Sequence, residues 1–145
     1  MISKTDGRSC KRCVVVAGLG IGFVTACSGS STPASAPPID PRLTVIEQKV
    51  FQISCTLSSC HGADTPQQGL NLAGSTYNVL VNQPSKEVPS KMLIAPADPN
   101  NSYLYEKISS DHPTSGARMP YTSPPLPDNE ITAVQQWIEQ GAQDD

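Results

Sequence analysis

The sequence predicts an all-α domain whose helices are joined by long, proline-rich loops. Apolar residues recur at helical spacing near residues 44–53, 98–108 and 128–140, and residues 76–81 fit a shorter helix. No segment shows the strict alternation of apolar and polar residues that is typical of a half-buried strand, although residues 92–95 fit a short extended piece. Fourteen prolines and ten glycines also favour loops over sheet.

The first helix is predicted to begin at Thr44. Glu47 follows three residues later, which is the pattern of a capping box. The apolar stripe that defines the helix consists of Ile46, Val50 and Ile53, with Phe51 beside it. We therefore expect this stripe to face the core.

The second and last helices carry recognisable start and stop residues. Asp98 is placed to cap a helix in which Pro99 takes the first position, with Leu104 and Ile108 on one face. The last helix is expected to run from Asp128 to about residue 140, where Gly141 stops it. Its apolar stripe consists of Ile131, Val134, Trp137 and Ile138. An acidic group that is expected to be solvated surrounds this helix: Asp128, Glu130, Glu139, Asp144 and Asp145.

The N-terminal residues are typical of an export segment. Four basic residues precede an apolar run of fourteen residues, 13–26, which fits a signal peptide and is too short to span a bilayer. The run ends in Val24-Thr25-Ala26-Cys27, which resembles the lipobox of bacterial lipoproteins. The pattern predicts a signal peptide over residues 1–26 and a lipid on Cys27, so the protein is expected to be exported and anchored to a membrane on its periplasmic or extracytoplasmic side.

Composition then divides the rest of the chain. Residues 27–41 are rich in Ser, Pro and Ala and are expected to form a tether, whereas residues 42–145 hold the helical patterns and form the predicted domain. From Cys27 onward, twelve acidic residues outnumber six basic ones. This charge excludes an obvious nucleic-acid binder, since no basic patch is available to neutralise several phosphates.

The most informative motif is Cys55-Thr56-Leu57-Ser58-Ser59-Cys60-His61, directly after the first helix. Two thiols can add to the two vinyl groups of a haem, and a histidine beside the second thiol can bind the iron. Two alternatives remain open on the residues alone. One is a disulfide between Cys55 and Cys60, and the other is a zinc site formed by these cysteines with His61 and His112, although adjacent Cys60 and His61 point apart.

The domain as a whole resembles the class I, mono-haem cytochrome c family. The resemblance rests on Phe51 before the motif, on Gly69-Leu70-Asn71-Leu72, on residues 95–107, on Arg118-Met119-Pro120 and on the closing helix. It departs from the family in leaving four residues, not two, between the cysteines, so that Ser58 and Ser59 must bulge outward. The resemblance implies a cytochrome c-like fold, in which the terminal helices pack around one covalent haem c.

The second axial ligand is expected to be Met119. It lies in a stretch without helical period, is flanked by Arg118 and Pro120, and occupies the position at which the family keeps its methionine. Met92 lies in an apolar run, where gap-filling is the expected role, and His112 fits a solvated loop.

A haem with both axial positions filled favours electron transfer over catalysis, so the expected function is that of an electron carrier with redox proteins as partners and no enzymatic activity. Two alternatives stay open. One is a haem-based sensor with a labile sixth ligand, and the other is a haem-free interaction lipoprotein stapled by a disulfide.

Overall fold

The computed structural model describes residues 36–57 and 59–145, and this part of the chain is helical. The helix α1 (Leu43–Ile46) runs directly into the π-helix η1 (Glu47–Cys55), and α2 (Tyr77–Leu80), α3 (Tyr103–Ser109) and α4 (Asp128–Glu139) follow. Two short 3₁₀ segments are η2 (Gln67–Gly69) and η3 (Pro99–Asn101). Pairing between extended segments within the described residues is limited to isolated bridges. The predicted signal peptide, Cys27 and residues 28–35 of the tether lie outside the described residues.

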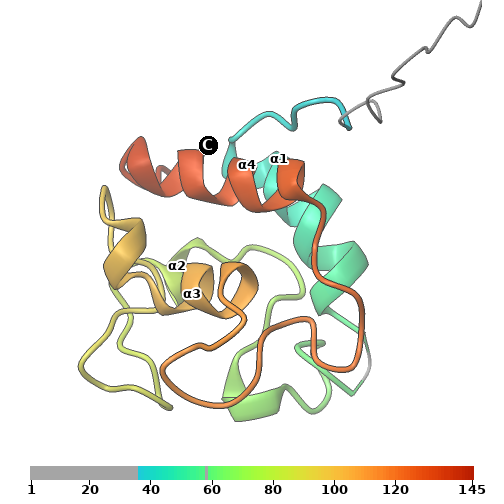
Figure 1. The fold of residues 1–145 in the computed structure, drawn as a ribbon, viewed down its shortest axis with the longest axis vertical. Coiled ribbons are helices and arrows are strands. Elements are labelled where there is room, and N and C mark those ends of the chain that lie inside the picture. Colours follow the sequence, from blue (N-terminus) through green and yellow to red (C-terminus); the bar gives the residue numbers. More distant parts are fainter. Residues whose placement is uncertain (1–35, 58) are drawn as a thin grey trace, which may run out of the picture. The chain divides into compact units, whose positions relative to one another are not determined.

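The first and last helices lie against each other, side by side at the top of Figure 1. The N–H of Leu43 donates to the Asp145 side chain (2.9 Å) and the N–H of Thr44 to the Asp145 carbonyl (3.0 Å). These bonds satisfy two of the donors that a helix N-terminus leaves unpaired. Trp137 is also buried between the helices, and its Nε1 donates to the Gln143 carbonyl at 2.9 Å. The first and last helices are thereby joined.

The first helix differs from its prediction because most of it is a π-helix. Hydrogen bonds from residue i to i+5 widen each turn, as between the Thr56 N–H and the Phe51 carbonyl (3.1 Å). The inward face therefore passes through Ile46, Val50 and Phe51, all at most 1% exposed, whereas Ile53 is 64% exposed. The expectation that Ile53 faces the core is wrong for this reason.

The predicted capping box is also wrong. Arg42 is the residue that precedes the first turn, and its side chain makes no capping hydrogen bond to the helix. The carboxylate of Glu47 instead accepts two bonds from Thr76, from its N–H (2.6 Å) and its hydroxyl (2.9 Å). Glu47 thus joins η1 to the segment before α2, a tertiary contact that local sequence does not contain.

The second helix begins as predicted but is interrupted. The Asp98 side chain accepts from the N–H of Asn101 (3.2 Å), and Pro99 opens the short segment η3. The chain then becomes extended at Ser102 before α3 begins. Leu104 and Ile108 are both buried, as the apolar pattern indicates. The last helix confirms its predicted start, its stripe and its stop at Gly141, where φ is +97°.

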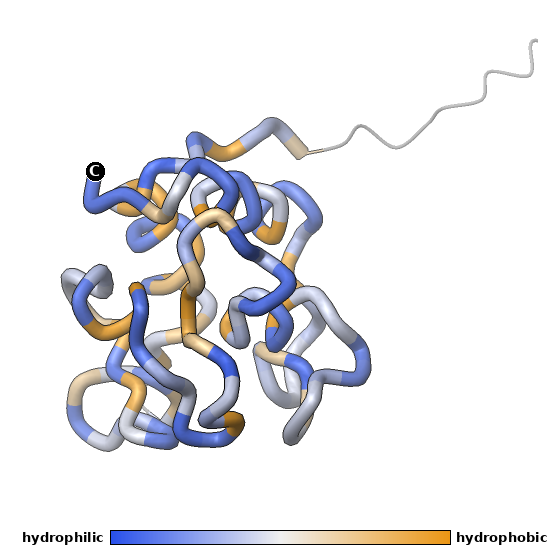
Figure 2. Tube along the Cα trace, turned by 90° about the vertical axis from the view of Figure 1, so that its left-hand side faces the viewer, coloured by the Kyte–Doolittle hydropathy of each residue, from blue (hydrophilic) through white to orange (hydrophobic). Residues whose placement is uncertain are grey.

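The fold also includes residues that were assigned to the tether. Ile39 packs against the core, and the side chain of Asn129 donates to the Pro37 carbonyl at 2.8 Å. In Figure 2 hydrophilic and hydrophobic stretches alternate along the whole described tube. Accordingly, none of the helices in residues 36–57 and 59–145 has the length and apolarity to cross a membrane.

Candidate functional site

A cavity of about 1000 Å³ lies among η1, the loop after it, α3 and the segment from residue 119 to 126. Cys55, Cys60, His61 and Met119 all line it. Much of the remaining wall is apolar: Val50, Phe51, Leu70, Leu72, Leu93, Leu104, Ile108 and Leu126. Its volume is at the upper end of the roughly 300–1,000 Å³ that is usual for small-molecule sites. The structure therefore brings together the four residues that the sequence predicted for one site.

The two cysteines are held by a closed loop after η1. The His61 N–H donates to the Cys55 carbonyl (3.0 Å) and the Cys60 N–H to the Leu57 carbonyl (2.8 Å). Leu57 and Ser59 are exposed, although both also line the cavity, while Ser58 lies outside the described residues. Both cysteines are free thiols. The structure thus presents two separate thiols and not the alternative disulfide.

The Cys55 thiol is strongly biased toward its neutral form. Burial raises its pKa to about 12, with smaller contributions from the charges of Glu130 and Cys60. Because the thiolate is the form that reacts with electrophiles and binds metals, an isolated Cys55 is a poor nucleophile. Within residues 36–57 and 59–145, no three His, Cys, Asp or Glu side chains cluster as a metal site would require. The zinc alternative therefore has no ligand set in this part of the chain.

His61 is oriented by the backbone on both sides. Its Nδ1 lies 3.0 Å from the Leu70 carbonyl, and its own carbonyl accepts from the Leu72 N–H (2.8 Å). A carbonyl can only accept, so Nδ1 carries the proton and Nε2 keeps its lone pair, which is the tautomer that metal-ligating histidines adopt. Gly62 follows without a side chain, and a Cβ there would lie 3.0 Å from the Thr56 carbonyl oxygen.

Met119 lines the cavity and packs against the core. Its N–H donates to the Lys107 carbonyl at 2.7 Å. The preceding Arg118 donates from Nε to the Ile108 carbonyl (3.1 Å) and from Nη1 to Asp111 (2.6 Å). Two successive residues are thereby hydrogen-bonded to the carbonyls at the end of α3, which would otherwise lack partners. The backbone at Met119 is fixed although it lies in a loop.

The two other candidates for the sixth ligand lie elsewhere. Met92 is 42% exposed and does not line the cavity, so the expectation that it fills a gap in the core is wrong. Its backbone instead forms bridges with Pro84 and Ser102, as in an extended piece, and this leaves the side chain outward. His112 is exposed and is likewise not part of the cavity wall.

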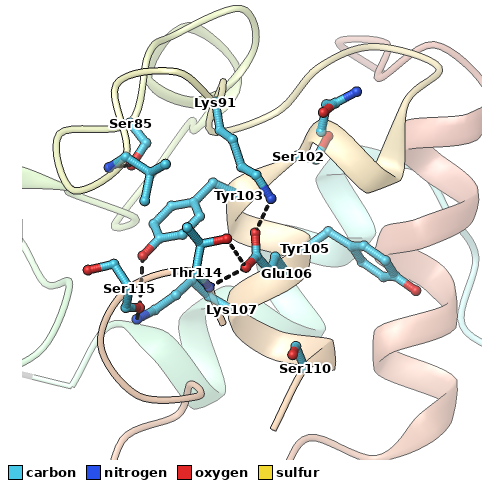
Figure 3. A network of polar contacts seen from close by, with 12 residues as sticks. Ser85, Lys91, Ser102, Tyr103, Tyr105, Glu106, Lys107, Ser110, Thr114 and Ser115 are labelled. Carbon is cyan, nitrogen blue, oxygen red and sulfur yellow. Dashed lines mark hydrogen bonds and ion pairs between the residues drawn. The ribbon is translucent and has the colours of Figure 1, made fainter. Parts of the chain in front are cut away.

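A polar network fixes the two loops on either side of α3 (Figure 3). Lys91 and Thr114 both donate to the Glu106 carboxylate, from the loops before and after the helix. Burial opposes the ionisation of Glu106, but the hydrogen bonds from Lys91 and Thr114 outweigh it and lower its pKa to about 2. The ionised carboxylate of Glu106 therefore links the loops before and after α3 to the helix.

Glu130 departs from its prediction as part of a solvated acidic face. One of its carboxylate oxygens is buried and has no hydrogen-bond partner among the described residues. Burial raises the pKa of this carboxyl, and its charge acts on Cys55. Position in the first turn of α4 gave no indication of this, since an acidic residue there is ordinarily explained by the helix dipole.

Comparison with known proteins adds no assignment. No protein-family model, no curated protein and no solved structure matches the chain.

Proposed function

We propose that this protein is an exported electron carrier of the cytochrome c class, with one haem c joined to Cys55 and Cys60 and with His61 and Met119 as axial ligands. The observation that carries the proposal is that all four residues line one cavity. They come from two segments that are separated by 58 positions between His61 and Met119. A disulfide between Cys55 and Cys60 would account for neither His61 nor Met119 at the same cavity.

The cavity has room for a large, partly apolar group. Protein interiors contain few voids larger than a water molecule, whereas this cavity measures about 1000 Å³, and six leucines, Ile108 and three aromatic residues stand in its wall beside polar side chains. Small domains commonly need a staple such as disulfides, a metal or a cofactor. The two free thiols at one side of the cavity supply the sulfur atoms for the two thioether bonds.

The axial residues suit a closed, low-spin site. The bond between His61 Nδ1 and the Leu70 carbonyl keeps Nε2 available as a neutral donor. Met119 offers a soft sulfur that favours the ferrous state and raises the reduction potential. Haem supplies a one-electron iron couple. With both axial positions filled, no coordination position is left for a substrate, and this supports electron transfer over catalysis.

The fold class supports the same proposal. The contact between α1 and α4 corresponds to the packing of terminal helices that a cytochrome c-like fold requires. The long connections between them, from residue 56 to 76 and from residue 110 to 127, supply about half of the residues around the cavity. We assign the cytochrome c-like fold as part of the proposal.

Haem staining after denaturing gel electrophoresis tests the attachment. We expect the stain to migrate with the polypeptide, because thioether bonds survive unfolding. A Cys55→Ala, Cys60→Ala double variant should lose the stain and fold poorly, whereas Ser59→Ala, which keeps both thiols, should retain it. Haem that runs free of the wild-type chain, or no stain at all, refutes the proposed function.

A further inference from the structure

The cavity wall is chemically divided. Its charged residues are Lys86, Glu87 and Lys107, which come from the loop after α2 and from α3. The thiols and the imidazole of His61 come from the end of η1 and the loop that follows it. In Figure 1 η1 and the 84–91 loop lie on opposite sides of the view. Two cations against one anion give this part of the wall a positive charge in a chain that is acidic as a whole.

Lys107 is the unusual member of this group because it is only 7% exposed. A buried ammonium is costly unless it is paired and hydrogen-bonded. Its Nζ donates to the Ser115 carbonyl at 3.0 Å and forms an ion pair with Glu87, whose nearer oxygen lies at 3.8 Å, beyond hydrogen-bond length. An ammonium has three N–H donors, so two of them have no hydrogen-bond acceptor among the described residues.

The surroundings fix the position of this ammonium but leave two of its three N–H donors without an acceptor among the described residues. It lies 5.7 Å from the centre of the Tyr103 ring, and Figure 3 shows Tyr103 and Lys107 both directed at Ser115. The Tyr103 hydroxyl is 3.0 Å from the Ser115 carbonyl and 3.1 Å from Glu87, but its one proton can serve only one of them. Gly116 closes the turn at φ +65°, and a Cβ there would lie 3.0 Å from Nζ.

Lys86 is a second cation at the same cavity. It is exposed, and its Nζ lies over Gly69, where a Cβ would approach it to 2.5 Å. Lysine serves as a compact cationic donor toward anions. The wall therefore offers one buried and one exposed ammonium, separate from the thiols, to a ligand that carries negative charge.

We propose that Lys107 binds a carboxylate of the cavity's ligand, and that this carboxylate is one of the two propionates of haem, with Lys86 available to the other. This inference rests on the proposed function. In a haem that is joined to protein through its vinyl groups, the propionates point away from the thioether bonds. The cavity wall has a matching arrangement, since its thiols and its ammonium groups come from different segments. The contact completes the hydrogen bonding of Lys107.

Nuclear Overhauser effects in the reduced, diamagnetic wild-type holoprotein test the contact without any variant. We expect cross-peaks between the Lys107 ε-methylene protons and the propionate methylene protons. In resonance Raman spectra, Lys107→Gln should shift a propionate bending mode. Lys91→Gln should not, because that ammonium pairs with Glu106 and does not line the cavity.

The failures of the inference and of the proposed function are distinguishable. Cross-peaks from Lys107 to the thioether protons, or propionate modes that are unchanged in Lys107→Gln, overturn the inference in a protein that still carries haem. A chain that retains no haem under denaturing conditions overturns the proposed function itself.

Discussion

Met119 is the residue on which the electronic properties of the proposed site depend. Replacing it by alanine removes the sulfur ligand, so we expect loss of the weak near-infrared sulfur-to-iron charge-transfer band, a high-spin spectrum, carbon monoxide binding on reduction and a lower potential. Met92→Leu and His112→Ala are the matched controls and should leave all four unchanged, since neither side chain lines the cavity. A low-spin spectrum that is unchanged in Met119→Ala and lost in His112→Ala identifies His112 as the ligand.

Individual residues show where sequence reasoning succeeds and where it stops. The motif at Cys55, Cys60 and His61 carries its chemistry in its spacing, so it could be recognised without a structure. The carbonyl that orients His61 could not, because the Leu70 backbone position depends on the path of the loop and not on residue type. Lys107 carries no sequence signal of its own, and only the fold reveals that its ammonium is buried.

At the scale of an element, the segment from Arg118 to Met119 depends on its hydrogen bonds to the end of α3. Arg118→Ala removes the bond to the Ile108 carbonyl and leaves Met119 less constrained. A hydrogen bond from a charged group contributes roughly 1.5 kcal/mol. In Arg118→Ala we therefore expect the fraction of protein in which Met119 is dissociated from the iron to be about tenfold larger than in the wild type. Carbon monoxide binding to the reduced protein measures that population.

Asp111→Asn is the control for Arg118, because Asp111 is 78% exposed at its side chain and contacts only the far end of the guanidinium. Exposed ion pairs contribute little, so this variant should bind carbon monoxide nearly as slowly as the wild type. Equal rates in Arg118→Ala and the wild type would show that the loop is held by other contacts.

The loops around α3 make a prediction about acid stability. In the folded state the pKa of Glu106 is lowered to about 2, from its ordinary value of 4.5. Its contribution is therefore present above the unfolded pKa and is lost as pH falls from about 4.5 toward 2. Glu106→Gln should cost roughly 2–3 kcal/mol at pH 7 and flatten the pH dependence of unfolding in this window.

Denaturant titrations between pH 2 and 7 measure this effect, with the exposed Glu139→Gln as the matched control. Glu139 bonds only to the Gln135 side chain one turn away, so its loss should change stability little. A pH dependence that is identical in Glu106→Gln and the wild type would contradict the role of this carboxylate.

Elements differ in how far sequence predicts them. The last helix was predicted from start to stop because its first-turn acidic residues, apolar stripe and terminal glycine are all local signals. The first helix was predicted in position but not in form. Whether a turn closes at i+4 or i+5 depends on what packs against it, and here Phe51 and Cys55 face inward where a regular α-helix would have directed Ile53. The contact between Glu47 and Thr76 joins residues that are far apart in the sequence, so it too depends on the fold and not on a local pattern.

At the scale of the whole molecule, the all-α class followed from periodicity, whereas the cavity did not. Its walls come from segments spread between Val50 and Leu126, and most of them are loops without a repeating pattern. Few regular elements surround this large cavity. The proposed cofactor would fill it and would supply packing to a small core. The structure adds the position of each segment around the cavity, which no local sequence pattern predicts.

The proposed function depends on a closed haem that exchanges one electron. A redox titration of the mature holoprotein, followed by visible and near-infrared spectra, tests this most directly. We expect a single reversible one-electron transition, low-spin six-coordinate spectra in both states, and a sulfur-to-iron band in the oxidised state. A high-spin resting spectrum that responds to carbon monoxide, or a chain without haem absorption, would contradict it.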